Sequence, residues 1–112
     1  MVVDPYVDAL QKRGYQLVKH IRNELNIKIR LVYGKPNEDT DGQCVCKKEL
    51  IIVYWNQCNW NWLREVIVHE SAHRYDCSIR GYMHHNIKFE HDQNYWKCYA
   101  KIWDVAKCSD VW

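Results

Sequence analysis

The chain has 112 residues, a length that fits one small domain with a single hydrophobic core. Its 47% hydrophobic and 27% charged residues exclude a disordered chain, and a formal net charge of +2 gives little support for a nucleic-acid or anionic-membrane partner. We therefore expect one globular domain over residues 1–112.

The first element predicted is a helix. Asp4 and Pro5 are typical of a helix start, with Asp as the cap and Pro at the first helical position. Apolar residues then recur at helical spacing from Tyr6 to Leu25, although Gly14 weakens the pattern slightly. The buried face of this helix is expected to contain Val7, Leu10, Leu17, Val18, Ile21 and Leu25.

Three short strands are predicted next. Residues 27–33 alternate between apolar and charged side chains, as a half-buried strand does, and the breaker-rich stretch 34–42 predicts a loop. Further strands are expected at 43–46 and 50–54, joined by a turn at 47–49. Two interpretations of 50–54 remain open: an edge strand to which a peptide substrate pairs, or a core strand.

Two helices are predicted to complete the chain. Asn59 or Asn61 caps a helix that ends at about Cys77, residues 78–90 are mainly loop, and a last helix covers 91–107. The order of elements predicts an α+β fold with a three-stranded antiparallel sheet packed against three helices.

The cellular location is predicted from two features that the sequence lacks. The N-terminus lacks a basic segment followed by an apolar run, and the longest apolar stretch, 50–55, is too short to span a bilayer. We therefore expect a cytoplasmic protein with no membrane partner. The six cysteines contain no C-x-x-C pair, which favours a mostly reduced set, although disulfides remain an open alternative. The C-x-C at Cys44 and Cys46 is a weak metal signal.

The most informative segment is the H-E-x-x-H motif from His69 to His73 on the second predicted helix. Histidines at i and i+4 project from one face of a helix, so both imidazoles can reach one zinc ion. Glu70, beside the first ligand, is placed to act as general base toward a water molecule. By chance the motif is expected about 0.02 times in a chain with this His and Glu content.

A catalytic zinc site usually has a third protein ligand. His91 is the favoured candidate because it opens the last predicted helix, from which its ring can point back toward the motif. The metzincin extension is absent, since Asp76 and Ile79 occupy the positions of its glycine and third histidine. The alternatives that remain open are His84, His85, Glu90 and Asp92.

The motif and the segment His91-Asp92-Gln93-Asn94-Tyr95-Trp96, seventeen residues downstream, resemble the SprT/Spartan family of small gluzincin-type zinc metalloproteases. The resemblance extends from about residue 27 through most of the chain. It implies a minimal zincin-like fold, one zinc ion bound by His69, His73 and His91, and Glu70 as the catalytic acid and base. It does not extend to the C-terminal zinc ribbon or DNA-binding region of many members, so DNA recruitment is not implied.

Other residues are weaker candidates. Asp76 is placed to orient a ligand imidazole through a hydrogen bond, although a surface position at a helix end is an equal alternative. Tyr75, Tyr82 and Tyr95 are candidates for a hydrogen bond to the developing oxyanion, and each is also a packing candidate.

The sequence thus predicts a zinc-dependent metallopeptidase acting on a protein or peptide substrate. The alternative is a non-catalytic zinc-binding domain that acts in protein or nucleic-acid interaction. A nucleic-acid partner would use the basic face of the first helix, which is also typical of an ordinary solvated surface. That face consists of Lys12, Arg13, Lys19 and Arg22.

Overall fold

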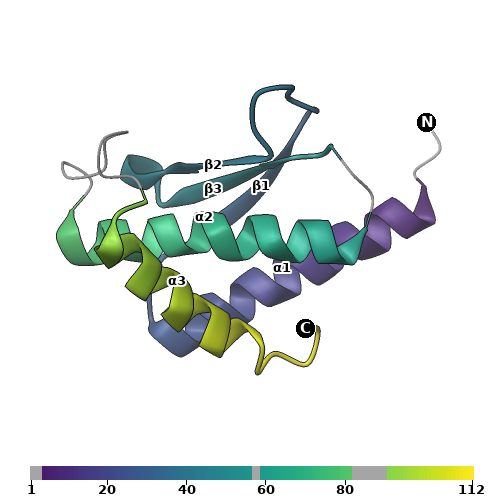
Figure 1. Cartoon of the computed structure of the whole chain (residues 1–112). Coiled ribbons are helices and arrows are strands. Elements are labelled where there is room, and N and C mark those ends of the chain that lie inside the picture. Colours follow the sequence, from purple (N-terminus) through teal and green to yellow (C-terminus); the bar gives the residue numbers. More distant parts are fainter. Residues whose placement is uncertain (1–3, 57–58, 82–90) are drawn as a thin grey trace.

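The computed structural model describes residues 4–56, 59–81 and 91–112. A three-stranded sheet lies on one side of the central helix α2, and helices α1 and α3 lie on the other side (Figure 1). The α+β class is as expected. In chain order the elements are α1 (Pro5–Leu25), β1 (Arg30–Gly34), β2 (Gly42–Val45), the 3-10 turn η1 (Cys46–Lys48), β3 (Leu50–Tyr54), α2 (Trp60–Arg80) and α3 (Gln93–Ala106).

The sheet is mixed, so the prediction of an antiparallel sheet is wrong for one pair. The strand order is β1-β3-β2: β1 pairs with β3 in parallel and β2 pairs with β3 antiparallel. After β1, residues 35–41 lead to β2 at the opposite edge of the sheet, and β3 then lies between β1 and β2. This path gives the parallel pair the long connection that it requires.

The segment 50–54 is therefore the central strand, and its interpretation as an edge strand is wrong. Ile51 and Val53 are fully buried, and Leu50 is nearly so. On the opposite face of the strand, Ile52 and Tyr54 are only partly buried. The edge position beside α2 belongs to β2 instead.

The helix starts follow the predicted caps. The Asp4 side chain accepts a hydrogen bond from the Tyr6 amide at 2.9 Å, and Asn59, rather than Asn61, accepts one from the Trp62 amide at 2.8 Å. Helix α3 begins at Gln93, two residues after the expected start, because Asp92 is its cap.

Helix α2 continues one turn beyond its expected end at Cys77, so the predicted loop is wrong for residues 78–80. An ion pair between Arg80 and Asp76, four residues apart, supports this last turn. The rest of the predicted loop, residues 82–90, lies outside the described residues. Within the parts of the chain that the structure describes, no helix is long and apolar enough to cross a membrane.

Gly14 marks a close approach between α1 and β1. The Tyr33 hydroxyl donates a hydrogen bond to the Gln11 carbonyl at 2.7 Å, and its oxygen lies over Gly14. A Cβ at position 14 would overlap that hydroxyl and would lie 3.2 Å from the Ile67 Cδ1. Glycine, the weak helix former noted in the sequence, is therefore required by packing.

We expect Gly14→Ala to lower the free energy of unfolding by about 1–2 kcal/mol, because overpacking outweighs the gain of about 1 kcal/mol in helix propensity. Urea denaturation measures the change. Adding Tyr33→Phe removes the overlapping hydroxyl, so Gly14→Ala should cost less in that background than in the wild type. A stabilised Gly14→Ala single variant would contradict the packing explanation.

Candidate metal centre

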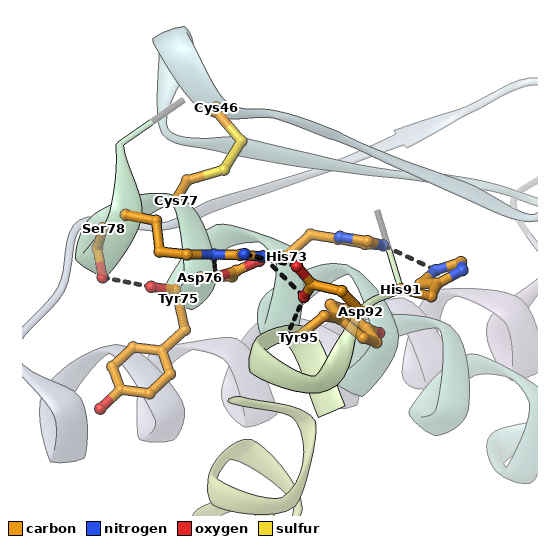
Figure 2. A network of polar contacts seen from close by, with 10 residues as sticks. Cys46, His73, Tyr75, Asp76, Cys77, Ser78, His91, Asp92 and Tyr95 are labelled. Atoms are coloured by element: carbon orange, nitrogen blue, oxygen red, sulfur yellow. Dashed lines mark hydrogen bonds and ion pairs between the residues drawn. A yellow bond between two sulfur atoms is a disulfide. The ribbon is translucent and has the colours of Figure 1, made fainter. Parts of the chain in front are cut away.

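Three histidine rings meet where α2 faces the start of α3. His69 and His73 lie one turn apart on α2, and His91 lies just before the α3 cap. The His91 Nε2 is 3.2 Å from the Nε2 of His73 and 3.2 Å from that of His69. Figure 2 shows His73 and His91 pointing toward one another from the two elements. The three residues named from the sequence are thus brought to one point.

The spacing of these nitrogens fits a metal ion. Zinc binds imidazole nitrogen at about 2.0–2.1 Å, and tetrahedral geometry then separates two nitrogens by about 3.3–3.4 Å. The three ring nitrogens lie within 4.8 Å of one another, and the two separations of 3.2 Å from His91 come close to this tetrahedral value. His73 is almost fully buried, whereas His69 and His91 reach the surface. The group is a candidate metal site that opens to solvent on one side.

Glu70 lies beside this histidine group at the edge of a cleft. Its Oε2 is 3.9 Å from the His69 Nε2, and its side chain is 9% exposed. The strand β2 closes against it: a Cβ on Gly42 would lie 2.9 Å from the Glu70 Cγ. The cleft has a volume of about 300 Å³. It is lined by Thr40, Asp41, Gly42, Trp62, Glu65, Val66, His69 and Glu70.

Tyr95 packs beneath the histidine rings. It is fully buried, its ring centroid lies 4.3 Å from that of His73, and its hydroxyl donates to the His69 carbonyl at 3.1 Å. These contacts hold both α2 histidines in place. A hydrogen bond from Tyr95 to an oxyanion stays a prediction. Trp96 is half exposed, and its ring centroid lies 5.9 Å from that of His91.

Asp76 is not at the surface. It is 1% exposed and receives two hydrogen bonds from Arg80, at 2.6 and 2.5 Å. Arg80 in turn donates to both oxygens of Asp92, at 2.7 and 3.1 Å. Figure 2 shows this bridge between the end of α2 and the start of α3. Asp76 thereby supports the position of His91, the neighbour of Asp92.

The charges in this bridge reinforce one another. The Arg80 hydrogen bonds, and then the Tyr95 amide, lower the pKa of Asp92 below its ordinary value. The two carboxylates raise the pKa of Arg80 above its ordinary value. Arg80 was not singled out in the sequence. Its i, i+4 spacing from Asp76 was the available signal, but the predicted loop over 78–90 obscured it.

The remaining sequence candidates are less informative. The Asp92 oxygens are engaged by Arg80 and by the Tyr95 amide, which makes Asp92 a cap and a bridge. Tyr75 is partly buried against the core. On the basic face of α1, Arg13 donates to the Val111 carbonyl at 2.7 Å and stacks on the Trp60 ring. Tyr82, His84, His85 and Glu90 lie outside the described residues.

A second group of potential ligands contains sulfur. Cys46 and Cys77 form a disulfide between η1 and α2, and the Cys44 Sγ lies 3.5 Å from the Cys46 Sγ. The expectation of reduced thiols is therefore wrong for this pair. Burial, and then the charge of Glu70, raises the pKa of Cys44 to about 12. Of the other cysteines, Cys98 and Cys108 are free thiols and Cys58 lies outside the described residues.

Comparison of the chain with protein-family models, with curated proteins and with solved structures found no match.

We expect Asp76→Ala to weaken zinc binding at the histidine group by about 10–100-fold, because the α3 start loses one anchor of its bridge. Removing one partner of a buried ion pair should also cost about 3 kcal/mol of stability. Competition with a chromophoric chelator measures the zinc affinity, and urea denaturation the stability.

The matched control is Asp104→Ala, which removes an exposed ion pair between α3 and its C-cap residue Lys107 and should change neither quantity. Asp76→Asn preserves the side-chain shape and serves if the alanine variant is unfolded. Wild-type zinc affinity in a folded Asp76 variant would show that the bridge does not position His91.

Proposed function

We propose that the chain is a zinc metallopeptidase of the SprT/Spartan type. The observation that carries the proposal is the meeting of three imidazole Nε2 atoms beside the Glu70 carboxylate, at the edge of one cleft. His69, His73 and His91 are the proposed zinc ligands. Three neutral nitrogen donors with one open side are the ligand set of a catalytic zinc site.

A bound zinc ion would polarise the scissile carbonyl and make a water molecule acidic enough to attack it near neutral pH. Glu70 accepts the proton of the attacking water and delivers it to the leaving amine. Its carboxylate can do this because it lies at the cleft while its Cγ lies close against Gly42 of β2. A zinc site that only stabilises a fold needs no carboxylate at that place, so Glu70 favours hydrolysis over a non-catalytic zinc domain.

The substrate proposed is an extended peptide that lies along the outer edge of β2. In the described sheet β2 pairs with β3 on one side only, and its first residue, Gly42, lines the cleft beside Glu70. A peptide strand added to that edge forms backbone hydrogen bonds with β2. Pairing along this edge would place the scissile bond of the peptide in the cleft beside the histidine group.

We expect protein purified without chelators, with the Cys46–Cys77 disulfide intact, to contain about one zinc per chain. His91→Ala should lose most of that zinc, because two imidazoles remain. The control His20→Ala removes a histidine of α1 that bonds the Val105 carbonyl, and it should retain the metal. Elemental analysis measures the zinc content per chain in each protein. A metal-free wild type, or a fully loaded His91→Ala variant, would overturn the ligand assignment.

We expect Glu70→Gln to retain zinc and fold but to cleave a fluorescein-labelled unfolded protein at least about 100-fold more slowly, because the amide cannot accept the proton. Glu24→Gln is the matched control, since it makes the same change at an exposed glutamate of α1 that does not line the cleft, and it should leave cleavage within about threefold. Zinc loss in Glu70→Gln, or wild-type cleavage by it, would show that Glu70 has another role. Absence of cleavage by the zinc-loaded wild type would favour the non-catalytic alternative.

A further inference from the structure

Cys44, Cys46 and Cys77 form a cysteine group with one sulfur atom more than the disulfide uses. Cys44 comes from β2, Cys46 from η1 and Cys77 from α2, and their sulfur atoms all lie within 4.8 Å of one another. The disulfide accounts for two of these residues. The third sulfur lies 3.5 Å from the Cys46 Sγ, a separation close to that of two thiolates bound to one metal ion.

The backbone explains why the three side chains gather. Alternate residues of a strand share a face, and Gly42 at the start of β2 lies against Val66 and Glu70 of α2. Cys44, two residues later, lies on the same face of β2. Cys46, directly after the strand, bonds Cys77 at the end of this contact between β2 and α2. Figure 2 shows the sulfur bridge joining the turn after β2 to the last turns of α2.

We propose that the reduced chain binds one thiophilic metal ion, with Zn²⁺ as the representative, through Cys44, Cys46 and Cys77, at a second site distinct from the histidine group. Thiolate sulfur is the ligand that selects such ions. The fourth position of the ion is left to water or to an added thiol.

Metal binding and the disulfide exclude one another, because both use Cys46 and Cys77. A thiol reductant transfers two electrons and two protons to the disulfide, giving two thiols and an oxidised reductant. The ion then displaces the protons of all three thiols into solvent. In the oxidised state the covalent bond ties the end of β2 to α2, and in the reduced state the metal ion does so.

Cobalt titration of the full chain tests this site separately from the histidine group. When Co²⁺ is added to reduced protein from which other metals have been removed, a sulfur-to-cobalt charge-transfer absorption should appear in the near ultraviolet. This absorption should saturate at one thiolate-bound ion per chain. Nitrogen ligands do not produce this band, so His91→Ala should leave it unchanged. Zinc should displace the cobalt and abolish the band, and protein with the intact disulfide should not develop it.

The decisive variant is Cys44→Ser, which leaves the two cysteines of the disulfide in place. We expect it to lose about one third of the charge-transfer intensity and to bind cobalt at least tenfold more weakly. Cys44→Ala gives the same test if the serine variant is unfolded. Cys108→Ser alters an exposed free thiol and should match the wild type.

Two results would overturn the proposal: reduced wild-type protein without the charge-transfer band, or a folded Cys44 variant that titrates like the wild type. In either case zinc binding by the histidine group in the same preparation would be unaffected. Failure of this site is therefore distinguishable from failure of the proposed metallopeptidase centre.

Discussion

The structure depends on the burial of polar side chains along one helix. Helix α2 is covered by the sheet on one side and by α1 and α3 on the other, yet it contains buried Glu70, His73, Arg74 and Asp76. A buried charged group is tolerated only when it is paired. Residues beside β1, β3 and α3 bind two of these groups, Arg74 and Asp76, either directly or through Arg80. The Arg74 guanidinium donates to the Lys28 carbonyl before β1 and to Glu49 before β3, and Asp76 reaches α3 through Arg80.

This arrangement explains how the third imidazole is held. His91 follows a segment outside the described residues, but its immediate neighbour Asp92 has two functions. Asp92 caps α3 by accepting the Tyr95 amide, and it receives Arg80 from the end of α2. Both bonds fix the chain one residue after His91, while the Tyr95 ring packs against the imidazoles from below. These protein contacts therefore bring the three imidazoles of the candidate metal centre together.

Local signals predicted the helices and the histidine group well. The Asp4 cap, the apolar spacing of α1 and the i, i+4 histidines all act within a few residues, where sequence order and spatial order coincide. The order and relative direction of the strands could not be predicted in the same way. A short strand has the same local sequence pattern whether its neighbour is parallel or antiparallel. Arg80, in the last turn of α2, bonds Asp92 at the start of another helix, and the cysteine pairing depends on β2 lying along α2. Both contacts join elements far apart in the sequence, and the one local signal, the i, i+4 spacing of Asp76 and Arg80, falls partly within the predicted loop.

Strand β2 links the two candidate metal sites. Gly42 approaches Glu70 so closely that a larger residue would displace the carboxylate, and four residues later Cys46 joins Cys77. On α2, Cys77 lies one turn after His73, about 6 Å along the helix axis. The Cys46–Cys77 disulfide therefore joins η1, directly after the strand whose first residue lines the cleft, to the end of α2. Because alternate residues of a strand share a face, Gly42 at the cleft and Cys44 in the cysteine group lie on the same face of β2, so one short strand borders both places.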